Sequence, residues 1–323
     1  MAKKCKFCNS YAVIKKGKHR GKQRYFCKNC LKKFVNKSRK KISLERKVVM
    51  EYIFKRRLLK DISDKFNLSK TKVREILLSF SLKEKTHRPR GVHILVDAIW
   101  FGKRRSKYSF CIIVFRDFKR KENLYWSVED SETKIAYLKG KVYLESLGYR
   151  ILSVTGDGFA GIRQAFKGIP YQMCQVHMER IVLRQTTRNP QTEAGQVLLA
   201  LIKTIHKTNK ETFFRRLKYF TLKYNDFLNE KSINPNTGKK FYTHKRVRSA
   251  WKSILFFSEY LFTYNKDNEI NKNTNSLEGH FGHIRDYLNI HRGLSKEMKI
   301  KFLYIIFHAS SVSPDKEKLN KIV

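Results

Sequence analysis

The chain has 323 residues with 71 Lys and Arg against 27 Asp and Glu, giving a formal net charge of +44 at pH 7. With 41% hydrophobic residues, about two or three domains could each bury a core, which excludes a disordered tail. Such a charge makes a compact chain repel itself and predicts a polyanionic partner, nucleic acid first; a set of solvated basic faces is the alternative. No apolar run reaches the roughly 18 residues of a membrane span, and no signal-peptide pattern occurs, which predicts a soluble cytoplasmic protein without a membrane partner.

Four of the six cysteines form two close pairs, separated by eighteen residues. Each pair can hold one side of a zinc ion, and the two pairs together complete a tetrahedral thiolate site. Disulfides are the alternative, which a reducing cytosol disfavours. The four predicted Zn²⁺ ligands are Cys5, Cys8, Cys27 and Cys30.

Residues 1–40 around these cysteines resemble a zinc ribbon. Short strands are predicted at Tyr11–Ile14 and Gln23–Phe26, on either side of the basic loop Lys15–Lys22. So small a segment buries little apolar surface, and we expect zinc to supply most of its folding free energy. The loop, which includes Arg20, is suited to phosphate contacts or is simply solvated.

Residues 41–86 place apolar side chains at helical spacing, which predicts three helices. The stretch from Leu59 to Ile76 resembles a helix-turn-helix, with Ser69 as the cap of the third helix. A three-helix unit that does not touch DNA has the same periodicity. The side chains that the third helix would offer to a DNA major groove are Lys70, Thr71, Lys72 and Arg74.

The pattern changes from helices to strands after residue 86, and the order of the segments indicates a mixed α/β sheet. Three short segments rich in β-branched and aromatic residues predict a meander, which is followed by a helix, a strand and a second helix. These segments are Val92–Ile99, Tyr108–Phe115 and Leu124–Val128, then Ser131–Leu147, Arg150–Val154 and Phe159–Phe166.

Two aspartates close apolar strand-like runs in this chain of few acids. Asp97 ends the run from Val92, and Asp157 ends the run from Ile151. A carboxylate at the end of a buried strand loses hydration free energy unless something pairs with it, and a divalent cation could pair with both. The two aspartates are therefore predicted to hold a metal ion together.

From about Gly91 to the C-terminus the chain resembles a DDE transposase of the Mutator-like class, in its bacterial insertion-sequence branch. Asp97 and Asp157 match the first two carboxylates of that class. Cys174-Gln-Val-His177 matches its Cys/Asp-x-x-His signature, and Thr274-Asn-Ser-Leu-Glu278-Gly matches the segment with the third carboxylate. Asn289-Ile-His-Arg-Gly-Leu-Ser295 resembles an extension found after it in some branches.

The resemblance implies an RNase H-like core in two parts, residues 87–190 and residues 269–323, with an all-helical insertion at residues 191–268. It implies that Asp97, Asp157 and Glu278 together hold two Mg²⁺ or Mn²⁺ ions. The implied partners are double-stranded transposon-end and target DNA. The implied assembly is a homodimer or a larger synaptic complex, associated with the bacterial nucleoid.

The third carboxylate is the hardest to assign, since Glu179 and Glu193 are nearer rivals to Glu278. Glu278 is preferred because Arg285, seven positions later, lies on the same helical face as a candidate phosphate clamp. Arg292 is a further candidate DNA contact. His177 either orients a phosphate or an attacking water as a catalytic residue, or has a structural role.

The predicted function is that of a transposase that binds terminal inverted repeats, cleaves the DNA to expose 3′-OH ends and joins them to target DNA. A zinc-ribbon DNA-binding regulator without catalysis is one alternative, which has no need for an intact set of carboxylates. A structure-selective or RNase H-like nuclease without strand transfer is the other. That nuclease would not need two separate DNA-reading modules.

Overall fold

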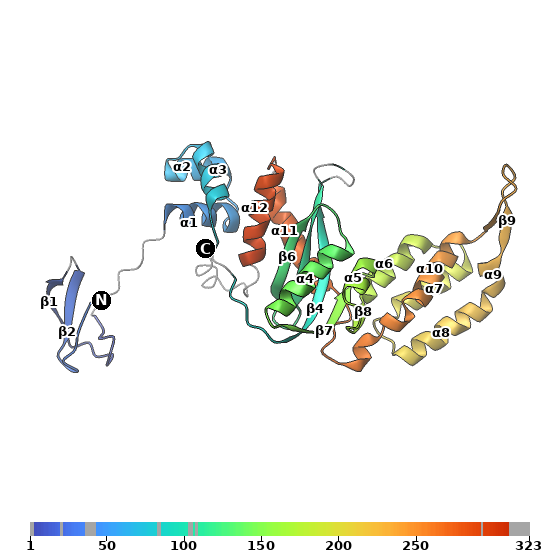
Figure 1. Ribbon diagram of the computed structural model, residues 1–323, viewed down its shortest axis with the longest axis horizontal. Coiled ribbons are helices and arrows are strands. Elements are labelled where there is room, and N and C mark those ends of the chain that lie inside the picture. The colour runs from blue at the N-terminus through green and yellow to red at the C-terminus, as the bar shows by residue number, and fades with distance from the viewer. Residues whose placement is uncertain are drawn as a thin grey trace. The chain divides into compact units, whose positions relative to one another are not determined.

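The computed structural model describes residues 3–19, 22–35, 43–82, 85–102, 106, 109–291 and 293–309 (Figure 1). The chain divides into two units, Met1–Lys47 and Val48–Val323. Among the described helices, none has the length and apolar character that crossing a membrane would require.

The first unit is a small antiparallel sheet in the order β1-β2-β3. Lys15, Lys16 and Lys18 lie within β1 rather than in the predicted loop, because backbone pairing with β2 continues where no apolar residue marks a strand. The register shifts between Lys15 and Lys18, around Gly17 at φ +68°. Arg20, at the predicted tip, lies outside the described residues. The strands are β1 Val13–His19, β2 Lys22–Cys27 and β3 Lys33–Val35.

Helical segments follow in the order that the sequence predicts. Asn67 ends the second helix in the left-handed region at φ +52°, and Ser69 Oγ accepts a hydrogen bond of 3.0 Å from the backbone N–H of Lys72. Ser69 therefore caps the third helix, as predicted. The segments are α1 Leu44–Val49, continued by η1 Met50–Phe54, then α2 Leu59–Phe66 and α3 Lys70–Ser79.

A five-stranded mixed sheet in the order β6-β5-β4-β7-β8 forms the centre of the second unit. The first three strands form the predicted antiparallel meander, whereas β7 is parallel to β4 and β8 is parallel to β7. The sequence analysis missed β8, which has three residues and is too short to show an alternating pattern. The strands are β4 Gly91–Phe101, β5 Phe110–Asp117, β6 Glu122–Glu129, β7 Arg150–Gly156 and β8 Tyr171–Met173.

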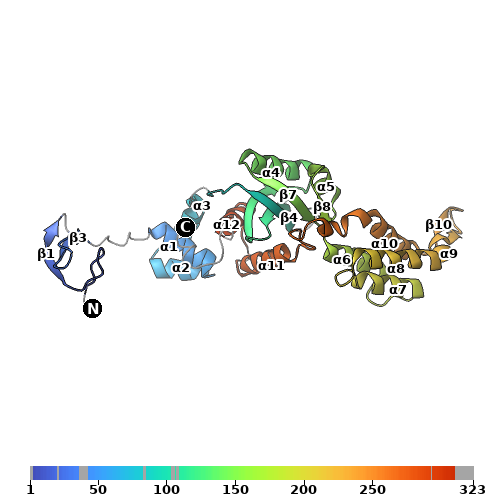
Figure 2. The same ribbon diagram turned by 90° about the horizontal axis from the view of Figure 1, so that it is seen from below.

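Helices cover both faces of this sheet (Figure 2). Alternate residues of β4 point into two different cores. Ile94 and Val96 point into the core shared with α4 and α5, and Leu95 and Ile99 into the core shared with α2, α3, α11 and α12. The second core thus ties α2 and α3 to the sheet. The covering helices are α4 Lys134–Ser146, α5 Ala160–Ala165, α11 Asn275–Ile290 and α12 Lys296–Ala309.

The insertion is not all-helical, contrary to the prediction, because residues 191–268 include the antiparallel strand pair β9 and β10. The turn Asn234–Gly238 brings these two strands together, and each is too short for a periodic signal. α6 packs against α7 and α10 beside the sheet. The elements are α6 Gln175–Thr186, α7 Glu193–Lys203, α8 Lys210–Lys223, α9 Asn225–Asn229, β9 Lys231–Ile233, β10 Lys240–Tyr242, α10 Lys245–Phe256, η2 Ser258–Tyr260 and η3 Thr263–Lys266.

Candidate active site

Asp97 lies inside β4, whereas the sequence had indicated the end of a strand. β4 continues to Phe101 because β5 pairs with it along that whole stretch, including Asp97 opposite Val114. On the other side β7 stops at Gly156, so Asp157 follows a true strand end. The two aspartates therefore lie where one neighbour of β4 ends and the other continues.

The register of the parallel pair β4 and β7 places the two aspartates side by side. Leu95 is paired with Thr155, so two residues further on Asp97 lies beside Asp157, on the same face of the sheet. Burial and the charge of Asp157 raise the pKa of Asp97 to about 7. Two carboxylates this close repel each other, and a shared cation would relieve the repulsion.

Backbone amides, rather than basic side chains, hold the two carboxylates. Asp97 Oδ1 accepts a hydrogen bond of 2.8 Å from the N–H of Ala98, and Asp157 Oδ1 accepts one of 2.9 Å from the N–H of Phe159. Within the described residues no Lys or Arg forms an ion pair with either aspartate. In this part of the chain neither carboxylate is therefore paired with a Lys or Arg, and a bound cation could pair with both.

The turn after Asp157 requires a glycine. Gly158 has φ +94°, and its N–H donates a hydrogen bond of 2.9 Å to the hydroxyl of Tyr171. A Cβ at this position would lie 2.8 Å from Met173 Sδ and 2.9 Å from Phe257 Cζ. Any larger residue would force either these two side chains or the turn that carries Asp157 to shift.

A short segment before α11 brings the C-terminal part of the chain to this edge of the sheet. Thr155 Oγ1 donates to the carbonyl of Asn271 at 2.9 Å, and the N–H of Gln175 donates to the carbonyl of Lys272 at 3.0 Å. α11 therefore begins beside β7 and α6. Glu278, in the first turn of α11, reaches the neighbourhood of the two aspartates in this way.

Glu278 is held by a cation that the sequence analysis did not single out. Arg180 of α6 donates two hydrogen bonds to it, of 2.8 Å to Oε1 and 2.7 Å to Oε2, and the Arg180 side chain is 49% exposed. His177 Nδ1 lies 3.7 Å from Glu278 Oε1. Arg285, the predicted clamp, is exposed on α11 and makes no hydrogen bond or ion pair in the described structure.

His177 belongs to a small polar cluster next to the carboxylates. Thr274 donates from its N–H and its Oγ1 to Cys174 Sγ, both at 3.4 Å, and Thr274 Oγ1 lies 3.4 Å from His177 Nδ1. Burial by itself lowers the pKa of His177, but the hydrogen bond to Cys174 and the charges of Cys174, Asp97 and Asp157 raise it overall. His177 is therefore inclined to carry a proton beside the acidic pair.

The two rival glutamates pair with groups of the helical insertion. Glu179 Oε2 lies 3.0 Å from His206 Nε2. Glu193 Oε1 accepts hydrogen bonds of 2.8 Å from Lys223 and 2.7 Å from Tyr224. Of the three candidates, Glu278 is the one in contact with His177.

A fourth carboxylate next to the aspartates was missed from the sequence. The hydroxyl of Tyr137 donates a hydrogen bond to Glu132, just before α4. Burial and the charge of Asp157 raise the pKa of Glu132, and Glu132 in turn raises the pKa of Asp97. In the sequence, Glu132 falls in the predicted helix Ser131–Leu147, where an acidic residue in the first turn is commonplace.

The four cysteines of the first unit gather as a metal site requires. Cys5 Sγ lies 3.6 Å from Cys30 Sγ, and Cys8 Sγ lies 3.5 Å from Cys27 Sγ. A disulfide would bring two sulfurs to about 2.05 Å, whereas Zn–S bonds of about 2.3 Å place tetrahedral sulfurs roughly 3.8 Å apart. All four are free thiols within 4.8 Å of one another, so the cluster could hold zinc.

Across the ranges that the structure describes, this is the one group of three or more His, Cys, Asp or Glu side chains with ligand atoms so close together. The oxygens of Asp97, Asp157 and Glu278 do not converge to that distance. Glu278 is instead paired with Arg180 of α6.

The predicted DNA-contacting side chains of α3 are exposed, and they are Lys70, Thr71, Lys72 and Arg74. Lys70 and Arg74 line a groove of about 590 Å³ that α3 forms with the connection between α11 and α12. Lys72 forms an ion pair of 3.0 Å with Glu75. Arg292 lies outside the described residues.

No protein-family model matches the chain, and no curated protein matches it. Among solved structures, a Drosophila P element transposase strand transfer complex is similar at 9% identity with a TM-score of 0.38, over 90% of this chain and 95% of that one. A simian T-cell lymphotropic virus intasome in complex with PP2A regulatory subunit B56 gamma is similar at 12% identity with a TM-score of 0.21, over 62% and 74%. Scores this low do not define a common fold, and the residues of this chain carry the interpretation instead.

Proposed function

We propose that the chain is a DNA transposase of the DDE type, with an RNase H-like core of the Mutator-like class. The observation that carries the proposal is the register of the adjacent parallel strands β4 and β7, which brings Asp97 of β4 beside Asp157, the residue that follows β7. The separate segment that bears Glu278 and the helix that bears His177 meet the same edge of the sheet. Two half-buried acids have no structural need to lie side by side.

The residues of this site fit a divalent cation such as Mg²⁺ or Mn²⁺. Carboxylate oxygens are the ligands that such hard cations prefer. Burial and the charge of Asp157 raise the pKa of Asp97, and a bound cation would offset both effects. Asp97 and Asp157 would hold the metal, joined by Glu278 once it leaves Arg180. When bound, metal ions in such a site neutralise charge on the attacking and leaving oxygens of a phosphodiester.

The basic side chains around the acids would orient the DNA backbone. His177, with its raised pKa, can donate a hydrogen bond to a phosphate oxygen. Arg180 can form the same bidentate contact with a phosphate that it forms with Glu278. Exchange of a carboxylate for a phosphate would free Glu278 when the DNA arrives.

The two N-terminal modules would recognise the ends of the element. α3 presents Lys70, Thr71 and Arg74 to a major groove, and a unit of four cysteines with bound zinc would bring further basic side chains. Joining two ends to a target requires two active sites, so a homodimer or larger synaptic assembly on double-stranded DNA is part of the proposal.

A cleavage and joining assay tests this function. The full chain, with Mg²⁺, is given pre-cut and uncut duplexes that carry the ends of the encoding element, together with a plasmid target. A transposase gives joined products from pre-cut ends. Nicking without joined products would support the nuclease, and binding without nicking would support the regulator.

A further inference from the structure

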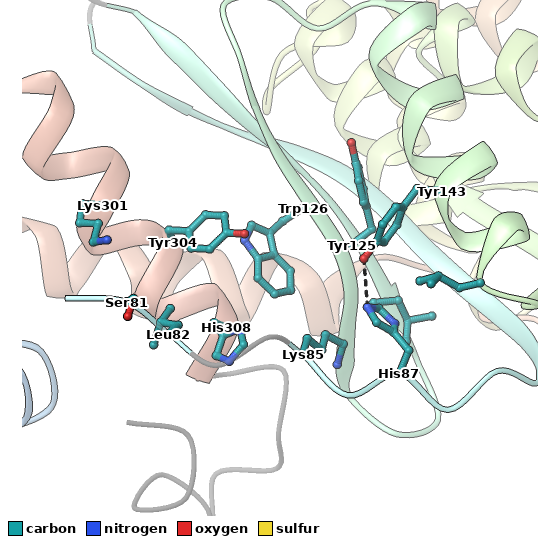
Figure 3. Close-up of a pocket in the computed structure, with 12 residues that line it drawn as sticks. Ser81, Leu82, Lys85, His87, Tyr125, Trp126, Tyr143, Lys301, Tyr304 and His308 are labelled. Atoms are coloured by element: carbon teal, nitrogen blue, oxygen red, sulfur yellow. Dashed lines mark hydrogen bonds between the residues drawn. The ribbon is translucent and has the colours of Figure 1, made fainter. Parts of the chain in front are cut away.

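A second concave site lies away from the carboxylates, at the outer edge of the five-stranded sheet. The cavity has a volume of about 720 Å³ and straddles the edge strand β6, between α12 on one side and α4 on the other. We call it the β6 pocket. The side chains that matter here are Lys301, Tyr304 and His308 of α12, Trp126 of β6, Tyr143 of α4 and His87 (Figure 3).

Aromatic rings form the walls of the β6 pocket. The centroid of the Trp126 ring lies 5.7 Å from that of Tyr304 and 6.1 Å from that of His308. On the other wall Tyr143 meets His87 at 5.8 Å between ring centroids, with a hydrogen bond of 3.3 Å between Oη and Nε2. Tyr304 is 49% exposed and Tyr143 is 43% exposed, so both rings offer surface to a ligand.

The β6 pocket also has the charge for an anionic ligand. No Asp or Glu is among the described residues that line it. Lys301 makes no ion pair in the described part of the chain, whereas Lys85 is paired with Glu122 at 2.6 Å. Burial and the charge of Lys85 lower the pKa of His87 and of His308, so the positive charge for a ligand comes from Lys301 rather than from these imidazoles.

We propose that the β6 pocket binds one or two unpaired nucleotides of a DNA strand, with bases against Tyr304 and Tyr143 and a phosphate at Lys301. Basic grooves with stacking platforms bind single strands in this way. A cavity of this size fits a small ligand and is too narrow for a duplex. Lys301 and Tyr304 also line an adjoining cavity that reaches Leu78 of α3, which gives a strand a path toward the helix-turn-helix.

The first test measures binding of the full chain to a fluorescently labelled oligothymidylate of about ten nucleotides, by anisotropy. We expect Tyr304→Ala and Lys301→Ala each to weaken binding about five-fold or more. Lys299→Ala removes the same charge from α12 outside the pocket and should have a much smaller effect. Equal loss in Lys301→Ala and Lys299→Ala, with no loss in Tyr304→Ala, would overturn the proposal.

The second measurement follows the fluorescence of Trp126 in the β6 pocket, so it does not depend on whether a Tyr304 variant folds. The double variant W100F/W251F leaves Trp126 as the sole tryptophan of the chain. We expect the oligothymidylate to change its fluorescence, and a duplex of equal length to leave it unchanged. No response to the single strand, or an equal response to both, would contradict the site.

Two competition experiments identify the kind of nucleotide ligand that the β6 pocket binds. Competition by dTMP as strong as that by the oligothymidylate would make the pocket a free-nucleotide site and overturn the assignment to a DNA strand. A clear preference for an oligouridylate would identify RNA as the ligand of the β6 pocket and would also overturn the assignment to a DNA strand. The inference does not rest on catalysis, so an inactive protein that still binds single strands through Lys301 would contradict the proposed function alone.

Discussion

Arg180 of α6 and Glu278 of α11 are joined by two hydrogen bonds, of 2.8 and 2.7 Å, although 98 positions separate them in the chain. The pair lies next to His177, which itself experiences the charges of Asp97 and Asp157. Glu278 is thus at the acidic site but occupied by an internal cation. Binding of a metal ion by all three carboxylates has to compete with Arg180.

Removal of Arg180 should therefore strengthen cation binding. The Arg180 side chain is half exposed, so its pair with Glu278 is worth about 1 kcal/mol or less, and Arg180→Ala should tighten Mn²⁺ binding by up to about five-fold. Titration followed by electron paramagnetic resonance measures this. Arg184→Ala removes an equal charge one turn further along α6 and controls for the general field. Equal affinities in the two variants would show that Arg180 does not compete with the metal.

The stability of the metal-free protein should depend on pH through Asp97. Unfolded Asp97 ionises near its ordinary pKa of 3.8 and the folded carboxyl near 7, so the folded state holds the proton more tightly between these values. The contribution of Asp97 to stability therefore falls as the pH rises from about 4 to 7 and stays low above 7.

Without added divalent cation, the change in the free energy of unfolding that Asp97→Asn causes should be more stabilising at pH 8 than at pH 4. The difference between the two pH values should be on the order of 2 kcal/mol. Chemical denaturation at the two pH values measures it. Asp64→Asn, at an exposed position of α2, controls for the loss of one negative charge. A gain at pH 8 no greater than that of Asp64→Asn would contradict the raised pKa of Asp97, which burial and the charge of Asp157 cause.

Two glycines with left-handed backbones should respond differently to alanine. Gly158 at φ +94° and Gly168 at φ +87° carry the same backbone strain on substitution, but a Cβ at Gly158 would lie 2.8 Å from Met173 Sδ while Gly168 has open space. Gly158→Ala should destabilise the protein by roughly 1–3 kcal/mol more than Gly168→Ala. Thermal unfolding of both variants checks this. An equal loss of stability in the two variants would mean that the side chains around Gly158 make room for a Cβ at no cost.

Zinc removal should unfold the first unit and spare the second. Cys5, Cys27 and Phe34 make up its small core, so the thiolate cluster has to supply most of its stability. In hydrogen exchange, a chelator or Cys8→Ser should deprotect β1–β3 and leave β4 and β7 protected. Ser10→Ala, which loses a hydrogen bond to Ala12 but no sulfur ligand, should keep the zinc. Protection of β1–β3 that survives the chelator would contradict a zinc-dependent fold.

The sequence predicts the elements with strong periodicity and misses those built by backbone pairing alone. The strands β4, β5 and β7 bury apolar runs, and Ser69 caps the start of α3 in a recognisable way. The strands β8, β9 and β10 have three residues each, and β1 contains several lysines. No side-chain pattern in the sequence therefore predicts these strands. The end of a strand also depends on its partner, which is why Asp97 lies inside β4.

The same limit applies to the candidate site. Asp97 and Asp157 stand out in the sequence because a carboxylate within an apolar strand is rare. Arg180 does not, because one more basic residue within a helix is ordinary in a chain with 71 Lys and Arg. Glu132 does not, because an acidic residue at the start of a helix is commonplace. Only the folded position of α6 against α11, and of α4 beside β7, brings them to the acidic pair.

The most direct test compares Glu278→Gln with Glu193→Gln in Mg²⁺-dependent cleavage of duplexes that carry the ends of the element, with binding of the same duplexes measured in parallel. Both variants remove one carboxylate, but Glu278 contacts His177 whereas Glu193 is paired with Lys223. We predict that Glu278→Gln reduces cleavage by about a thousand-fold or more with binding nearly unchanged, while Glu193→Gln cleaves like the parent protein. Cleavage retained by Glu278→Gln and lost in Glu193→Gln would contradict the proposed site.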